Sequence, residues 1–447
     1  MNQDRAELGE APIGRLLVKM SLPATFAMLI NGLYNLVDTI FIGRGVGTEA
    51  IGGLALAFPA QMIIMGFGFS IGQGASSIVS RSLGAQNDAR ARRAAGNAFA
   101  LALTAGLLIL VSGRLFLEPL LNLLGAEGSL REHARSYLSV ILLGSPFIML
   151  AMSSNNLLRA EGKARVSMVV MLVGALTNII LDPIFIFVFR MGVAGAAWAT
   201  VIGQFLAFLY ASIFFIMKKS LVQVRVKHWI PRRSVVREIV FLGFPTFIRQ
   251  GGQSVVGVLL NNMLGIYGGA IYISAYGVVN RLIMFLMMPL FGTVQGFQPI
   301  AGFNYGAGLF HRVRRTLKIT FLYATAYTTV GFLLLFFMTR TLAGIFTTDP
   351  ELIDTVTHVI HYVFAVFPLV GIQIVGGTYF LVIGKSFPSL VLNLSRQFLL
   401  LIPLLLILPG FFGLTGLLVS FPVADFLATF ITVIWLMAEL KHLSEDV

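Results

Sequence analysis

The chain has 447 residues, of which 57% are hydrophobic and 11% charged, and its net charge is +13 at neutral pH. Soluble globular domains carry about 25% charged residues, so this composition excludes an ordinary soluble protein and predicts a polytopic membrane protein. The absence of cysteine excludes a disulfide framework and a thiolate metal site. Residues 1–11 are polar and acidic, unlike a cleaved signal peptide, so we expect the first span to be retained.

Apolar runs separated by charged or Gly/Pro breaks predict twelve transmembrane helices, since about 20 mostly apolar residues cross the hydrocarbon core. They begin near residues 15, 52, 93, 134, 165, 193, 236, 274, 315, 356, 390 and 415. The N-terminus and the connections after even-numbered spans hold most of the 32 Lys and Arg residues. The positive-inside rule therefore predicts a protein of the inner (plasma) membrane with both termini in the cytoplasm. Its basic residues would face an anionic leaflet, and we expect no nucleic-acid partner.

The first predicted span carries a polar stripe. Asn31, Asn35 and Asp38 follow one another at helical spacing, and Tyr34 lies about one turn before Asp38. Polar side chains inside a membrane are costly unless they face a cavity or one another. We therefore predict that Tyr34 and Asn35 line a site built around Asp38.

The fifth predicted span carries the second set of polar residues. Residues 166–189 form an apolar run in which Asp182 is the one ionisable side chain. A charge at the bilayer centre costs roughly 3 kcal/mol on insertion scales and usually marks an ion or substrate path. Asn178 shares a helix face with Asp182, and Pro183 removes the N–H that would bond to the Ile179 carbonyl. An amide, a carbonyl and a carboxylate together suit a proton or a hard cation.

The acids of these two spans lie at matching depths. At about 1.5 Å of rise per residue, Asp38 and Asp182 reach similar distances from the outer ends of their helices, and Thr200 of the sixth span reaches the same level. We predict that Asp38, Asn178, Asp182 and Thr200 converge in the outer half of the N-terminal bundle. Two neighbouring carboxylates can be neutralised by protons or by a cation. The competing interpretation is a hydrogen-bonded cluster that only holds helices together.

The chain repeats itself at an offset of 222 residues. The offset pairs Pro23 with Pro245, Gln73-Gly74 with Gln295-Gly296, Pro146 with Pro368, and Gly162-Lys163 with Gly384-Lys385, before a one-residue slip near Gly192 and Gly413. Because six spans is an even number, the two halves have the same orientation, related by an axis along the membrane normal. We predict an all-α fold of two six-helix bundles, with lobes at 1–217 and 236–447 and a cytoplasmic linker at 218–235.

The second half does not repeat the acids. The offset places Leu260 at the position of Asp38 and Leu404 at the position of Asp182. One acid, Asp425, lies inside the last span. We expect it to pair with Arg249, Arg281 or Arg396, and favour a structural ion pair over a role in coupling.

This doubled plan resembles the MATE family, the multidrug and toxic compound extrusion transporters. The resemblance rests on Pro23, Asp38, Gln73-Gly74, Asn178, Asp182-Pro183 and Gln295-Gly296-Phe297-Gln298-Pro299. The chain is most similar to the DinF-like branch, in which an aspartate of the first span and an Asn-x-x-x-Asp pair of the fifth form a cation site with a threonine of the sixth. The resemblance implies that Asp38, Asn178, Asp182 and Thr200 bind H⁺ or Na⁺. It also implies that Tyr34 and Tyr137 lie near that aspartate. Residues 236–264 and 360–382 lack the intramembrane acids of the NorM branch, so no sodium site of that type is expected in the C-terminal lobe.

The resemblance further implies cation-driven antiport of amphipathic, often cationic, drugs by alternating access between the two lobes. We expect a monomer in the lipid bilayer with no cofactor besides the coupling ion. A lipid-linked oligosaccharide flippase of related plan is the alternative, and it would favour a cleft rich in Arg and Lys. An intramembrane enzyme is not expected, because the chain has no His-Glu-x-x-His motif and no deeply placed histidine.

Overall fold

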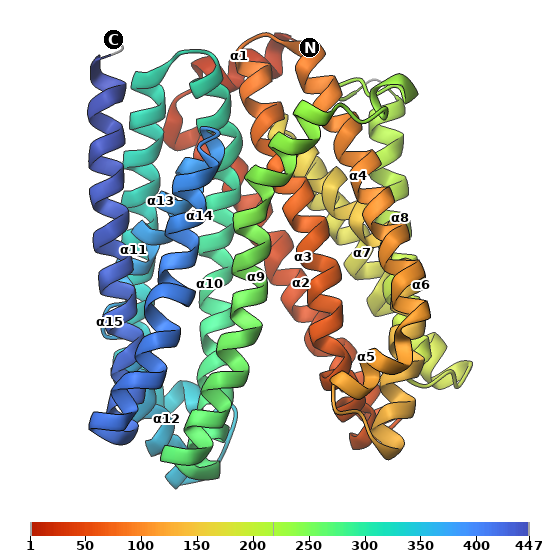
Figure 1. Ribbon diagram of the computed structural model, residues 1–447, viewed down its shortest axis with the longest axis vertical. Helices are drawn as coiled ribbons and strands as arrows, with labels where there is room; N and C mark the ends of the chain where they lie inside the picture. The colour runs from red at the N-terminus through yellow and green to blue at the C-terminus, as the bar shows by residue number, and fades with distance from the viewer. Residues whose placement is uncertain (1, 218, 446–447) are drawn as a thin grey trace.

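The computed structural model describes residues 2–217 and 219–445, and these form helices joined by short connections (Figure 1). The described residues contain no β-strand. Four residues of the predicted lobes and linker lie outside the described residues: Met1, Lys218, Asp446 and Val447.

The N-terminal lobe contains six spans after a short first helix, α1 (Asn2–Glu10). The spans are α2 (Ile13–Gly45), α3 (Thr48–Gly84), α4 (Asp88–Leu115), α6 (Gly128–Ala160), α7 (Ala164–Pro183) continued by the π-helix η1 (Ile184–Val188), and α8 (Val193–Ile216). The short helix α5 (Leu117–Leu123) lies between α4 and α6. Each of the six is long and apolar enough to cross a membrane.

The C-terminal lobe follows the short 3₁₀ helix η2 (Val226–His228) of the linker. Its helices are α9 (Arg233–Tyr267), α10 (Gly269–Gly306), α11 (Phe310–Ala343), α12 (Pro350–Val363), α13 (Phe367–Val382), α14 (Ser386–Leu394), the π-helix η3 (Ser395–Leu401), and α15 (Ile402–Glu445). Taken together, α12 and α13 are long and apolar enough for one span, with a bend of 54° between them.

A glycine inside α15 separates the last two spans, the first of which comprises α14, η3 and the start of α15. Gly413 has φ 58° and ψ −138°, a conformation that breaks the helix and that only glycine adopts easily. Gly192, which precedes α8, has nearly the same angles, φ 59° and ψ −138°. The two lobes therefore turn between their fifth and sixth spans in the same way. Length and apolar composition alone identify nine spans in the described residues, or ten with the bent pair. Dividing α15 and adding α9 gives the predicted twelve.

The two lobes touch in the half of the molecule that carries both termini, which we call the termini end (Figure 1). There α3 packs against α9, and α10 packs against α2 and α3. A Cβ added at Gly84 would lie 1.9 Å from the Phe303 carbonyl oxygen, and one added at Gly306 would lie 1.9 Å from the Arg81 carbonyl oxygen. Both glycines and both carbonyls are related by the 222-residue offset, so the interface repeats itself about the symmetry axis. Small residues permit this close helix approach.

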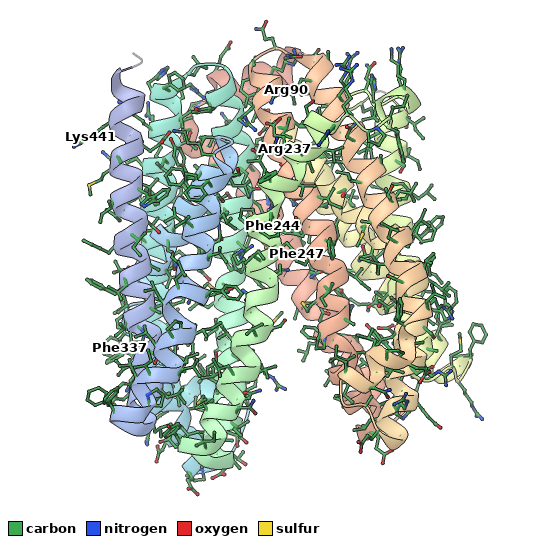
Figure 2. All side chains as sticks on the ribbon, in the orientation of Figure 1. Arg90, Arg237, Phe244, Phe247, Phe337 and Lys441 are labelled. Carbon is green, nitrogen blue, oxygen red and sulfur yellow. The ribbon has the colours of Figure 1, made fainter. Side chains whose placement is uncertain are left out.

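Beyond these contacts the lobes splay apart (Figure 1). Among the outermost contacts are the rings of Phe67 and Phe247, whose centroids are 4.5 Å apart, and the side chain of Met288 against Gly32. Figure 2 labels Phe247 where α9 borders the other lobe. Further along α9, a Cβ added at Gly251 or Gly257 would meet no atom within 4 Å. We call the part beyond the Phe67–Phe247 contact the splayed half.

The linker is held against the N-terminal lobe by two buried polar residues. The fully buried carboxylate of Glu161 accepts hydrogen bonds from Ser220 Oγ (2.6 Å) and from the Leu221 N–H (2.8 Å). Burial raises the pKa of Glu161 to about 7. Asn97 donates to the His228 carbonyl at 2.9 Å. The connection between the lobes is therefore tied to one of them.

Candidate functional site

The four predicted coupling residues lie together inside the N-terminal lobe. Asp38 comes from α2, Asn178 and Asp182 from α7, and Thr200 from α8, and these three helices pack against one another. Asp182 is 0% exposed and Asn178 is 2% exposed. Asp38 and Thr200 are also buried. The structure therefore brings together the four residues that the depth comparison placed at one level.

The side-chain amide of Asn178 bridges Asp182 of its own helix and Thr200 of α8. The orientation that satisfies both ends of the amide places its nitrogen 3.3 Å from Asp182 Oδ2 and its oxygen 3.1 Å from the Thr200 hydroxyl. The same oxygen also accepts from the Thr200 N–H at 3.3 Å. Asn178 thus fixes the rotamer of the Asp182 carboxylate and links α7 to α8.

The carboxyl groups of Asp38 and Asp182 lie close together where α2 packs against α7. Two neighbouring carboxylates repel each other when both are ionised, so a proton or a cation beside them is favourable. One oxygen of Asp38, Oδ1, is buried and has no hydrogen-bond partner among the described residues. This arrangement can hold a proton, and it leaves one buried acceptor available to an incoming cation.

Two buried tyrosines lie beside the acids. Tyr34 and Tyr137 are both close enough to interact electrostatically with Asp38 and Asp182. The Tyr137 hydroxyl donates to Gln61 Oε1 at 3.2 Å. The sequence analysis missed Gln61, although it is the one strongly polar residue in the apolar run 54–69 and could have been found on that ground.

Asn35 and Pro183 occupy the edge of the cluster. Asn35 is exposed, and its amide donates to the Asn31 carbonyl at 2.7 Å, within its own helix. Pro183 ends α7 where the chain changes to the π-helix η1, so the helix irregularity predicted there is confirmed. A π-helical turn often marks a functional part of a helix.

In the C-terminal lobe Asp425 pairs with Arg396, one of the three arginines considered from the sequence. The distance from Arg396 Nε to Asp425 Oδ1 is 2.5 Å. The Asp425 side chain is 8% exposed, whereas that of Arg396 is 31% exposed. The pair joins η3 to α15, as a structural ion pair would.

Comparison with known proteins identifies the relatives of this chain. The MatE family model matches it twice, over residues 23–184 and 245–407. The two matches begin 222 residues apart, the same offset as the internal repeat. The multidrug export protein MepA of Staphylococcus aureus strain N315 is 28% identical over 416 residues, covering 93% of this chain and 92% of MepA. MepA of Staphylococcus haemolyticus strain JCSC1435 is 28% identical over 426 residues, covering 94% of each protein.

Solved structures show the same fold. The MATE multidrug transporter DinF-BH, solved as a complex, is 39% identical to this chain, with a TM-score of 0.89 and 96% of each chain covered. A MATE family transporter solved in an outward-facing conformation is 24% identical, with a TM-score of 0.92 and 98% of each chain covered. Because the outward-facing transporter is only 24% identical, its similarity to this chain concerns the fold alone.

Proposed function

Because this chain belongs to the MatE family, we propose that it is a secondary transporter, rather than an enzyme, that exports amphipathic, often cationic, drugs in exchange for H⁺ or Na⁺. The names of its relatives support drug export, since MepA is a multidrug export protein and DinF-BH is a MATE multidrug transporter. We further propose that it works as a monomer in the cell membrane with both termini in the cytoplasm.

The closeness of the Asp38 and Asp182 carboxyl groups is the observation that carries the coupling proposal, together with the buried Asp38 Oδ1 that has no hydrogen-bond partner among the described residues. When both groups are ionised, two negative charges lie close together inside the membrane, which is unfavourable. Either a new proton or a cation must then enter. The site therefore alternates between a protonated form and a form that attracts positive charge, as exchange of an ion for a cationic drug requires.

Both candidate ions can use these residues. A proton needs only the two carboxyl groups. Sodium would take oxygens from Asp38, Asp182, Thr200 and Asn178, whose amide oxygen already faces the Thr200 hydroxyl.

The arrangement of the lobes supports alternating access. The lobes are closed at the termini end and apart in the splayed half, so with cytoplasmic termini this state opens to the outside. Transport then requires the repeated glycine contacts at Gly84 and Gly306 to separate. The ion can shift the equilibrium between the state closed at the termini end and the state open there only by the difference between its affinities for the two states.

The experiment is efflux of a fluorescent organic cation from proteoliposomes under an imposed pH gradient or an imposed Na⁺ gradient. Proton coupling predicts export driven by the pH gradient at zero sodium. Export driven by sodium alone would assign the site to Na⁺. The absence of gradient-driven export for a panel of organic cations, with correctly inserted protein, would contradict the proposed function and favour the flippase alternative.

A further inference from the structure

The C-terminal lobe carries positive charge in its spans where the N-terminal lobe carries acids. Arg249 lies in α9, Arg281 in α10 and Arg396 in η3. Glu238 and Glu439 lie near the termini end, where they pair with Arg81, Arg90 and Lys385, and Asp425 is the acid deeper in the spans. Asp425 is paired with Arg396. Two guanidinium groups inside membrane-spanning helices therefore have no carboxylate partner among the described residues. Unpaired charges at membrane depth are costly and usually mark a substrate or ion path.

Arg249 lies level with the floor of the splayed half. It follows Phe247, whose ring touches Phe67 of the other lobe, by two residues, so its side chain leaves α9 on a different side, toward α10 and η3 of its own lobe. Its guanidinium lies 5.8 Å from the centroid of the Phe291 ring and makes no hydrogen bond to a described residue. The charge of Arg396 lies near enough to repel it. An aromatic ring offsets only part of the desolvation of a guanidinium, so Arg249 is left with unused donors.

Arg281 faces the N-terminal lobe further out. It is exposed, and it lies seven residues, or two helical turns, before Met288, which touches Gly32. The helices α2 and α10 are antiparallel, with Thr25 against Gly292. Continuing this register places Arg281 level with residues 36–39 of α2, the segment that contains Asp38. Arg281 thus lies at the level of the acids that are buried inside the N-terminal lobe.

We propose that the C-terminal lobe provides an anion subsite, with Arg249 at its floor and Arg281 at its entrance, for an acidic group carried by the transported amphiphile. This inference rests on the proposed function and deepens it: the preferred substrates carry a carboxylate or phosphate as well as a cationic group. The planar guanidinium of Arg249 can donate two parallel hydrogen bonds to such a group, a geometry that lysine cannot reproduce. The acids of the N-terminal lobe attract the cationic end.

The test uses two probes that differ only in the acidic group: a cationic xanthene dye with a free carboxylate and the ethyl ester of the same dye. Their binding to purified protein in phosphatidylcholine nanodiscs is measured by fluorescence polarisation. We expect Arg249→Gln to weaken binding of the free acid about tenfold, the loss of a charge-assisted hydrogen bond, and to change binding of the ester less than about twofold. Arg281→Gln, at an exposed position, should lower the association rate of the free acid more than that of the ester.

Arg237→Gln is the matched control, because Arg237 also lies on α9 with its guanidinium 5.3 Å from a ring, that of Phe241, but at the termini end (Figure 2). It should leave both affinities unchanged. Equal effects of Arg249→Gln on acid and ester, or no effect on either, would overturn the subsite. If Arg249→Gln is unstable, binding of the free acid and of the ester is compared in Arg281→Gln instead, and equal effects on the two dyes would overturn the subsite. Export of both dyes without any preference would reject this inference alone, whereas export of neither would reject the proposed function.

A second set of binding measurements tests whether the anion at the subsite belongs to the substrate or to a lipid headgroup. Replacing part of the phosphatidylcholine by phosphatidylglycerol should not affect free-acid binding if the anion is the substrate's own. If phosphatidylglycerol weakens binding of the free acid to wild type but not to Arg249→Gln, a lipid headgroup occupies the subsite. That result would overturn the assignment to substrate.

Discussion

The carboxyl group of Asp38 lies beside that of Asp182, where the first span of the N-terminal lobe packs against its fifth. Two ionised carboxylates at this position repel each other, whereas a proton or a cation removes the repulsion. Loss of that positive charge would therefore weaken the contact between α2 and α7. This relationship couples the charge of the site to the packing of two helices.

Asp38→Asn is expected to abolish gradient-driven export while leaving the fold intact. An amide keeps the size of the carboxyl group but can neither exchange a proton nor hold the charge of a cation. Drug efflux from proteoliposomes measures the effect, with Glu127→Gln as a control because Glu127 is an exposed acid whose side chain caps no helix N–H. Near wild-type efflux by well-expressed Asp38→Asn would remove Asp38 from the mechanism.

Asp425→Asn is expected to lower stability and to impair transport less than Asp182→Asn does. Removing one partner of a buried ion pair leaves an uncompensated charge. Because the Arg396 side chain is 31% exposed, we expect a cost of about 2 kcal/mol rather than the larger values of fully buried pairs. Thermal unfolding in detergent gives the value, and the double variant with Arg396→Gln should recover part of it. A stable Asp425→Asn protein that transports nothing would instead assign Asp425 to coupling.

Pro183→Ala is expected to reduce turnover more than drug binding. Restoring the N–H at this position favours a regular helix across the α7–η1 junction. If that junction rearranges between states, a shift of about 1.4 kcal/mol would change their ratio tenfold. Binding and efflux of one fluorescent cation are compared on the same preparation. Pro350→Ala is the control, because Pro350 lies in the first turn of α12, where its missing N–H costs no helical bond. Unchanged binding and unchanged efflux would make Pro183 a tolerated irregularity.

Gly74→Val is expected to open the termini end. A Cβ at Gly74 would lie 2.1 Å from the Ile239 carbonyl oxygen, so the closed contact cannot accept a side chain. Because the chain has no cysteine, Ser77→Cys can report on the contact: Ser77 Oγ donates to the Leu381 carbonyl at 2.6 Å across the lobes. Labelling of this cysteine by an impermeant maleimide should increase at least about tenfold in the Gly74→Val background. Gly251→Val is the control, because a Cβ at Gly251 meets no atom within 4 Å, and it should leave labelling unchanged. Equal labelling of Ser77→Cys with and without Gly74→Val would contradict the prediction.

Glu161→Gln is expected to remove one component of the pH dependence of stability. Its pKa is raised from 4.5 to about 7 in the folded protein, so the folded state keeps a proton that the unfolded state has lost. The free energy of unfolding then falls as pH rises from about 4.5 to about 7, by at most about 1.4 kcal/mol per pH unit. Unfolding temperatures at pH 5 and pH 8 should therefore differ less in Glu161→Gln than in wild type. Glu118→Gln is the control, since Glu118 belongs to a partly exposed ion pair with Arg131. If the difference between the unfolding temperatures at pH 5 and pH 8 is the same in Glu161→Gln as in wild type, Glu161 is not the source of this pH dependence.

Much of the fold could be predicted from the sequence because its determinants are periodic. The apolar runs predicted every span start to within several residues, and the 222-residue offset predicted the doubled architecture. The offset also paired Gly192 with Gly413 after a one-residue slip, and the structure shows that the chain turns in the same way at both. The spacing of Asn178 and Asp182 placed two groups on one face of α7. A helix converts residue number into height and angle at a constant rate, so such relations within one helix, and depth comparisons between helices, need no coordinates.

Only the tertiary structure decided what depends on how neighbouring helices are rotated and tilted. Three arginines were possible partners of Asp425, and helix packing brings Arg396 to it. The same rotations bring Gln61 to Tyr137 and turn Asn35 outward, although Asn35 shares a sequence stripe with Asp38. Which end of the lobes is closed depends on glycines meeting carbonyls of the opposite lobe, contacts between residues more than 200 positions apart. The spacing of residues along one helix carries no information about the rotation or tilt of a neighbouring helix. For that reason these contacts between helices could be read only from the tertiary structure.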